Sequence, residues 1–239
     1  MLLRILVLCS FIILTKLTCA QSTSSGWIDY NHTRYLSPDF SIKGDVGYRT
    51  NFSGDDFNLF LLRPGVNYRI NKTFQVQGNV AIFLTYNQEF ANSREFRLAQ
   101  EVRATWPRFK RFRFDHRVRA EERFFAFEQI EGIEDQRSSD QDVRLRYFLA
   151  GTSDYLNVGP LGNLFFTGSV EFFTTLGEET EGLISDRSRV YAGWGQLLNK
   201  GWSYAIHFIW QQSRNAFGNF ESDEFVVRLR IYWKSQVPN

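Results

Sequence analysis

The sequence predicts an all-β fold, a single antiparallel transmembrane β-barrel of 10–12 strands. Eleven segments alternate apolar and polar residues, which is the period of a β-strand with two different faces. Aromatic residues make up 17% of the chain, with 24 Phe, 10 Tyr and 6 Trp, more than a soluble domain of this size usually needs. Barrel proteins use such residues in lipid-facing belts and in girdles at the membrane surfaces.

The first twenty residues are predicted to be a cleaved signal peptide. Arg4 supplies a positive charge, residues 5–14 form an apolar run too short to span a bilayer, and residues 18–20 precede a cut before Gln21. We therefore expect residues 21–239 to form one barrel domain in the outer membrane of a Gram-negative bacterium. No run of 18 apolar residues follows this segment, so no transmembrane helix is expected.

Both cysteines of the chain, Cys9 and Cys19, lie in the predicted signal peptide, so the mature chain has no disulfide. Lipidation of Cys19 is the alternative to simple cleavage. The flanking Lys16 and Thr18 are unfavourable for a lipidation signal, and they favour cleavage.

The charge of the chain excludes a general affinity for nucleic acid. There are 28 basic and 26 acidic residues, and the basic Arg4 and Lys16 leave with the signal peptide. The mature chain would then be neutral overall, without the global basic field that nucleic acid requires.

Each expected strand has about the ten residues that a tilted membrane strand requires. The strands are residues 27–36, 40–51, 57–70, 74–87, 95–106, 111–125, 142–153, 164–176, 187–198, 202–213 and 223–233. The outward phase carries apolar side chains throughout, and in the strand 202–213 it places Trp202 and Trp210 near the two ends.

The connections alternate in length, as the periplasmic turns and outer loops of membrane barrels do. The short turns are residues 37–39, 71–73, 107–110 and 199–201, and the long loops are residues 88–94, 126–141, 177–186 and 214–222. Residues 154–163 are longer than this alternation predicts. Eleven is also an unexpected count, because single-chain bacterial barrels have even numbers of strands. Either the segment 27–36 is not a full strand, or one strand is missing from the prediction.

The polar phase of the strands is rich in arginine and predicts a basic interior. The candidate functional residues form a lumen charge cluster: Arg63, Arg97, Glu101, Arg103, Arg113, Asp115, Arg117, Arg119, Glu121, Arg123, Arg144, Arg146, Glu171, Arg189, Arg228 and Arg230. Lys43, Asp45, Arg49 and Arg69 share this face, which gives fifteen bases and five acids. The compensating acids are expected in the long loops, for example Glu128 and Asp140.

Two functions are compatible with such an interior. Arginines that fork onto Glu101, Asp115, Glu121 and Glu171 would plug a narrow barrel with ion pairs. Alternatively, the excess of bases would select anions in a narrow pore or a binding cavity. The small barrel circumference favours the plug. Gly193 and Gly195 are expected to face inward and to make room for large neighbouring side chains.

An outer-membrane lipid-modifying or hydrolytic enzyme is the alternative function. It would need a nucleophile within hydrogen-bond reach of a base. His116 is expected on the outer face and His207 on the inner face, while Ser203 is roughly 13 Å from His207 along the same strand. The three histidines have no metal-ligand spacing, so we expect no metal and no cofactor.

Three groups of residues resemble an uncharacterised family of Gram-negative outer-membrane proteins, domain of unknown function family 2490. They are residues 63–68 (RPGVNY), 116–124 (HRVRAEERF) and 144–147 (RLRY), and Trp27 and residues 189–193 also fit. The resemblance covers nearly all of the mature chain. It implies an outer-membrane barrel and no known activity.

These observations together predict an outer-membrane barrel with a structural role, or with a narrow pore or binding role for a small anionic solute or a lipid headgroup. The expected partners are outer-membrane lipid and such an anion, without nucleic acid, and the expected state is a monomer. A soluble β-sandwich or lipocalin-like binder is the third class. The outward faces of the strands are too apolar for it.

Overall fold

Twelve β-strands and no α-helix form the described part of the chain in the computed structural model. It describes residues 22–52, 57–87, 92–128, 139–159, 162–176, 186–214 and 220–238. The predicted signal peptide and most residues of the four predicted long loops lie outside these ranges. The strands are β1 (Ser22–Tyr35), β2 (Phe40–Asn51), β3 (Asn58–Arg69), β4 (Phe74–Tyr86), β5 (Ser93–Thr105), β6 (Phe112–Phe127), β7 (Ser139–Ser153), β8 (Leu156–Asn157), β9 (Asn163–Leu176), β10 (Arg187–Leu197), β11 (Trp202–Arg214) and β12 (Phe220–Lys234).

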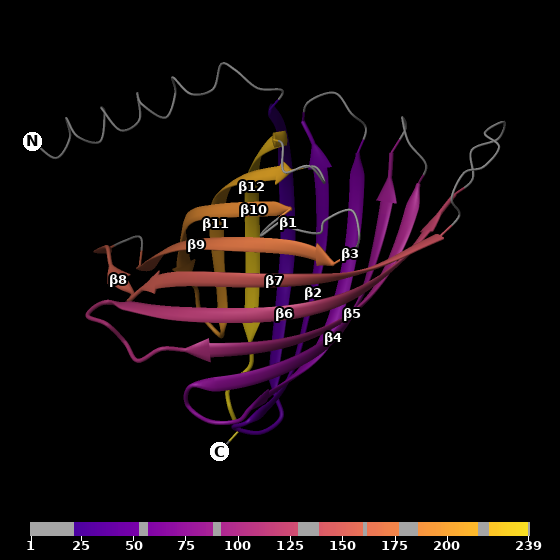
Figure 1. Ribbon diagram of the computed structural model, residues 1–239. Helices are drawn as coiled ribbons and strands as arrows, with labels where there is room; N and C mark the ends of the chain where they lie inside the picture. Colours follow the sequence, from indigo (N-terminus) through magenta and orange to yellow (C-terminus); the bar gives the residue numbers. More distant parts are fainter. Residues whose placement is uncertain are drawn as a thin grey trace, which may run out of the picture.

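Eleven long strands close into one barrel, which confirms the predicted all-β barrel (Figure 1). Each long strand pairs antiparallel with the next one along the chain, and β7 pairs with β9. The barrel is closed by β1 and β12, which run parallel. Eleven strands that reverse direction at each step leave the first and last pointing the same way. A parallel closing pair is therefore the geometric consequence of the odd count.

The expectation that the segment 27–36 was not a full strand, or that a further barrel strand was missing, was wrong. The segment 27–36 belongs to β1, a full strand of 14 residues. It pairs from Ser22 to Thr33 with β12 and from Ser25 to Tyr35 with β2. The seam continues beyond the strand ends, where Ser235 donates its backbone N–H to the carbonyl oxygen of Thr33 at 2.9 Å. The first and last strands are thus paired along most of their length, as the other neighbouring strands are.

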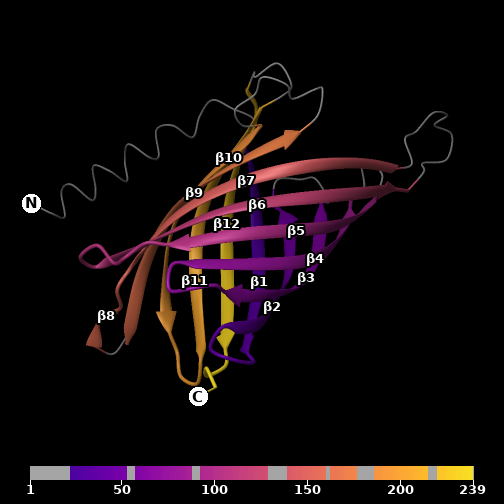
Figure 2. The same ribbon diagram turned by 60° about the horizontal axis from the view of Figure 1, so that its bottom comes forward.

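The ends of the barrel differ, as the alternating connections predicted. Short turns of residues 36–39, 70–73, 106–111 and 198–201 join strands at one end, and the C-terminus lies there too (Figure 2). Lys200 and Gly201 have positive φ angles of 58° and 81°, which a two-residue hairpin turn requires. The longer connection after β7 contains β8, whose two residues fold back onto β9. This small hairpin accounts for the one junction that exceeded the predicted length.

Alternation along each strand separates a buried face from an exposed apolar face. On β5, Glu95, Arg97 and Glu101 are buried. Phe96 and Val102, which have the opposite phase on the same strand, are 43% and 49% exposed. Because a closed sheet has only an inside and an outside, the buried phase is the interior of the barrel. Two small apolar clusters also lie on this inner face, one around Trp27 and Ile209 and one around Leu61 and Phe83.

Candidate functional site

The residues of the lumen charge cluster all share the phase of the buried residues on their strands. Strand β3 supplies Arg63; β5 supplies Arg97, Glu101 and Arg103; β6 supplies Arg113, Asp115, Arg117, Arg119, Glu121 and Arg123; β7 supplies Arg144 and Arg146; β9, β10 and β12 supply Glu171, Arg189, Arg228 and Arg230. Strand β6 contributes most because its charged residues repeat at every second position over six consecutive inward places. The interior charge therefore concentrates on the wall formed by β5, β6, β7 and β9.

Glu121 on β6 is the centre of this wall, and its side chain is 0% exposed. Arg144 donates to Glu121 Oε2 from Nε at 3.0 Å and from Nη2 at 2.7 Å. Arg146 donates to the other oxygen, Oε1, from Nη1 at 2.7 Å. Arg119 Nη1 lies 3.4 Å from Oε1, and Arg97 Nη1 lies 3.5 Å from Oε2. One carboxylate is thus shared by four guanidinium groups.

Glu171 on β9 is the second centre. Its Oε1 accepts from Arg117 Nη2 at 2.6 Å and from Arg146 Nη2 at 2.7 Å. Its Oε2 accepts from the hydroxyl of Tyr191 at 2.8 Å. Arg146 therefore bridges Glu121 and Glu171 and links β6, β7 and β9 inside the barrel.

Glu101 on β5 extends this chain of ion pairs. Its Oε2 accepts from Arg119 Nε and Nη2 at 2.9 and 2.6 Å. Arg119 also lies beside Glu121, so a continuous chain runs from Glu101 through Arg119, Glu121 and Arg146 to Glu171. Such charge-assisted bonds are the strongest hydrogen bonds in proteins, and they hold four neighbouring strands in register.

Aromatic rings fill the remaining interior and stack on the same arginines. The guanidinium carbon of Arg97 lies 4.0 Å from the ring centre of Phe83, and that of Arg117 lies 4.4 Å from Phe148. Arg49, which the sequence placed on this face, stacks on Trp27 at 4.2 Å. These cation–π contacts let arginine pack against apolar side chains while it keeps its charge.

Burial shows that this level of the barrel is filled. The side chains of Glu121, Glu101 and Glu171 are 0%, 2% and 2% exposed, and that of Arg119 is 5% exposed. A continuous water channel beside these groups would leave them in contact with solvent. The Glu121 side chain is fully buried, so the side chains around it enclose its carboxylate.

The inner face holds more acids than the sequence predicted, so its excess of bases is smaller. Asp29, Glu95 and Asp142 also lie on the inner face, where they pair with Arg228, Arg97 and Arg123. Glu95 lay in phase with Arg97 and Glu101, so alternation alone identifies it. Asp29 was missed because the segment 27–36 was doubted as a strand. Arg187 adds one further inward base on β10, where it donates to Ser213 at 3.1 Å.

The three histidines have structural contacts. His116 lies on the outer face, where its Nδ1 is 2.6 Å from the hydroxyl of Tyr147 and its ring is near Trp106. His207 is buried on the inner face opposite Gly193. A Cβ on Gly193 would lie 2.9 Å from the His207 ring, as expected for a glycine that makes room for a neighbour. In the described ranges, neither histidine makes a hydrogen bond to a serine hydroxyl, and no group of His, Cys, Asp and Glu could hold a metal ion.

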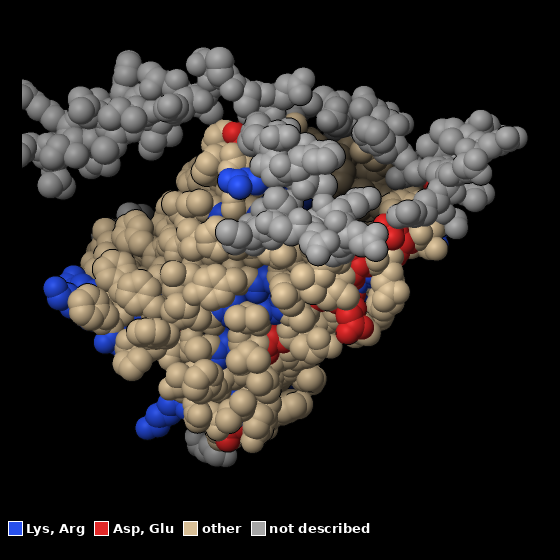
Figure 3. Space-filling model, in the orientation of Figure 1, with Lys and Arg blue, Asp and Glu red and all other residues tan. Residues whose placement is uncertain are grey.

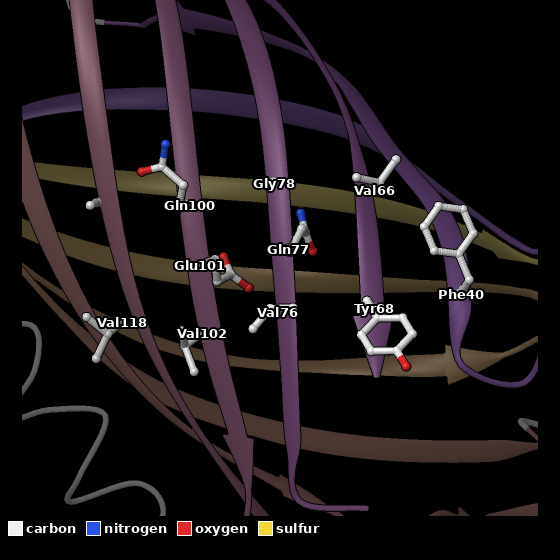
Figure 4. A pocket seen from close by; sticks show the side chains of 11 residues that line it. Phe40, Val66, Tyr68, Val76, Gln77, Gly78, Gln100, Glu101, Val102 and Val118 are labelled. Carbon is white, nitrogen blue, oxygen red and sulfur yellow. The ribbon is translucent and has the colours of Figure 1, made fainter. Parts of the chain in front are cut away.

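A shallow depression of ≈ 470 Å³ lies on the outer wall, where Gly78 has no side chain (Figure 4). Val66, Tyr68, Val76, Val102 and Val118 surround it with apolar surface. Its position on the outer phase distinguishes it from the buried ion pairs. None of the described residues forms a helix that is long and apolar enough to cross a membrane.

A family model described as "Protein of unknown function (DUF2490)" matches residues 24–233, which extend from β1 almost to the end of β12. The match therefore covers the whole barrel. No curated protein matches the chain.

Proposed function

The chain belongs to the DUF2490 family of proteins of unknown function, and we propose that it is an outer-membrane β-barrel whose interior is sealed by ion pairs. Its role is structural or binding, and it does not conduct solutes through an open pore. The complete burial of Glu121 among four arginines carries this proposal.

The outer surface supports placement in a membrane. Large apolar side chains are exposed in the middle of strands, for example Val80 and Ile82 at 42% and 47% and Phe208 at 58%. Trp202 and Trp210 are 39% and 40% exposed toward the two ends of β11. Water is a poor solvent for such a surface, whereas lipid with aromatic girdles at its boundaries suits it. A signal peptide at residues 1–20 would direct the chain across the inner membrane and would then be removed.

The ion-pair network suits a sealing role better than a conducting one. Glu101, Glu121 and Glu171 each accept at least two hydrogen bonds from arginine, so an anion that entered at this level would have to displace a charge-assisted contact. A barrel of this size is also only slightly wider than one that side chains fill completely. Small anionic solutes or lipid headgroups would therefore bind at an end of the barrel instead of passing through its middle. We expect a monomer surrounded by outer-membrane lipid.

Membrane extraction and conductance test this proposal. The full chain should fractionate with outer membranes, require detergent for extraction, and migrate faster on gels before heating than after it. In planar bilayers the wild-type protein should show no steady conductance. The double variant Arg119→Ala/Arg146→Ala should conduct, because it removes the bridges among Glu101, Glu121 and Glu171.

The outward-facing Val118→Ala is the matched control and should stay silent. Heat-dependent gel migration shows whether each variant has folded. Steady wild-type conductance would overturn the sealed interior, and extraction into buffer without detergent would overturn the membrane location.

A further inference from the structure

Five basic side chains converge on the inner face at the short-turn end of the barrel. They are Lys43 on β2, Arg69 on β3, Arg103 on β5, Arg113 on β6 and Lys234 on β12, and we call them the basic ring. Each has the phase of the buried residues on its strand and lies within four residues of a turn or of the strand's end. They therefore face the mouth of the barrel from both sides of its interior.

Electrostatic interactions connect the members of the ring. Lys43 interacts with Arg69, Arg103 and Lys234, which stand on three other strands. Lys234 also interacts with Arg103 and Arg113. These interactions among cations are repulsive, and Glu101 attracts Lys43 at the same time. The five cations thus form a connected set, in which each one interacts with at least one other across the mouth.

Carboxylate pairing weakens abruptly at this level. In the sealed middle, Glu101, Glu121 and Glu171 each have at least one arginine contact of 2.6–2.7 Å. In the ring, Arg103 reaches Glu101 at 3.3 Å and Arg113 reaches Asp115 at 3.4 Å. Lys43 donates to a neutral partner, Asn67 Oδ1, at 2.9 Å.

Arg69 and Lys234 have no ion pair to any residue in the described ranges. The acids in the nearby turns do not compensate for them. Asp154 pairs with Arg108 at 2.9 Å, outside the ring, and Asp39 is exposed in its turn.

The ring is open to solvent, unlike the sealed middle. The side chains of Arg103 and Arg113 are 36% and 54% exposed, compared with 5% for Arg119. Figure 3 shows basic side chains at the left and lower left, where short turns lie, an acidic group at the bottom near the C-terminus, and further acidic side chains on the right. An anion would therefore meet the ring from the short-turn side.

We infer that the basic ring binds a phosphate-type anion, either free or as the headgroup of an anionic phospholipid. The inference rests on the proposed sealed barrel, because a ligand that stays at the mouth requires a closed interior behind it. The ion pair between Glu101 and Arg119 closes the interior next to the ring. Three guanidinium groups and two ammonium groups can donate to the oxygens of a phosphate. A bound anion would also reduce the repulsion among the five cations.

A pair of charge variants at the same end tests the inference. Arg69→Gln/Lys234→Gln removes two ring cations without leaving a described carboxylate unpaired. Lys72→Gln/Lys200→Gln removes the same charge from exposed turn residues outside the ring and is the control. Binding is measured by titration calorimetry in non-ionic detergent at low ionic strength. The probes are inorganic phosphate, short-chain phosphatidylglycerol, and phosphatidylcholine as a zwitterionic reference.

The ring variant should bind the anionic probe at least about tenfold more weakly than the wild type, because it lacks two of the five cations that face the anion; tenfold corresponds to about 1.4 kcal/mol. The control variant should bind as the wild type does. Binding of phosphate alone identifies a free anion, and binding of phosphatidylglycerol without phosphate identifies a headgroup.

Equal binding by the two variants, or no binding of either anion by the wild type, would overturn the inference. Heat-dependent gel migration and the absence of conductance are read in the same samples. If the wild type binds neither anion but keeps both of these properties, the ring alone is rejected. If the wild type lacks either property, the proposed function is rejected.

Discussion

Arg228 on β12 donates from Nε to Asp29 on β1, and this ion pair crosses the only parallel seam of the barrel. Asp29 is 1% exposed and Arg228 is 7% exposed. The two residues are 199 positions apart in the chain. A buried charge pair of this kind fixes the register of the first strand against the last.

Asp29→Asn should therefore destabilise the barrel. The substitution leaves the charge of Arg228 buried without a partner, which typically costs about 3 kcal/mol. Urea unfolding in detergent micelles, followed by tryptophan fluorescence, should show a lower midpoint. Asp39→Asn, in an exposed turn, should leave the midpoint unchanged. Equal midpoints for the two variants would mean that the seam does not depend on this pair.

Glu121→Gln should be more harmful, because four arginines share this carboxylate. We expect a loss of about 3–5 kcal/mol in the free energy of unfolding. Combining it with Arg146→Met should cost less than the sum of the two single changes, because both changes remove the same Arg146–Glu121 ion pair, which can be lost only once. A double-mutant cycle measures this coupling, and strictly additive costs would contradict the network.

Gly193→Ala should destabilise the barrel, and Gly78→Ala should not. A Cβ at Gly193 would meet the carbonyl oxygen of Ile206 and the ring of His207 on the neighbouring strand. Such overpacking costs about 1–3 kcal/mol. At Gly78 a Cβ would meet nothing within 4 Å, and it would partly fill the outer depression. The melting temperatures of the two variants provide the comparison, and similar losses would contradict the close packing at Gly193.

Lysine substitutions on the outer wall test how deeply each substituted position lies in a membrane. Val80→Lys should cost about 2–4 kcal/mol in folding into lipid vesicles, because this residue lies in the middle of β4 on the outer phase. Ile70→Lys, directly after β3, should cost at most about 1 kcal/mol because it would lie near the membrane surface. Equal and small costs would indicate that water surrounds this wall instead of lipid.

Local alternation was sufficient to find the strands and their faces. The expected segments all correspond to strands, and residues such as Arg97, Arg119 and Glu121 lie on the face that the period of two assigns to them. The apolar outer residues were equally visible, because each strand carries its own two-sided pattern. These features depend only on neighbours within a few positions, so one sequence contains them.

Pairing between distant residues was not visible in the same way. The sequence placed Arg49 and Arg189 on the inner face, but it did not show that both stack on Trp27. It also grouped Arg103 and Arg113 with the buried arginines. The structure separates them, because their places near strand ends put them at an open mouth.

The sequence by itself determined an all-β barrel with an apolar outside and a charged inside, since alternation is a property of each strand alone. Only the tertiary structure decided that eleven strands close through a parallel pair and that Asp29 meets Arg228 there. It also decided that the interior is full at Glu121 and basic at the short-turn end. The physical reason is that closure, register and charge pairing depend on the combined geometry of strands up to 199 residues apart.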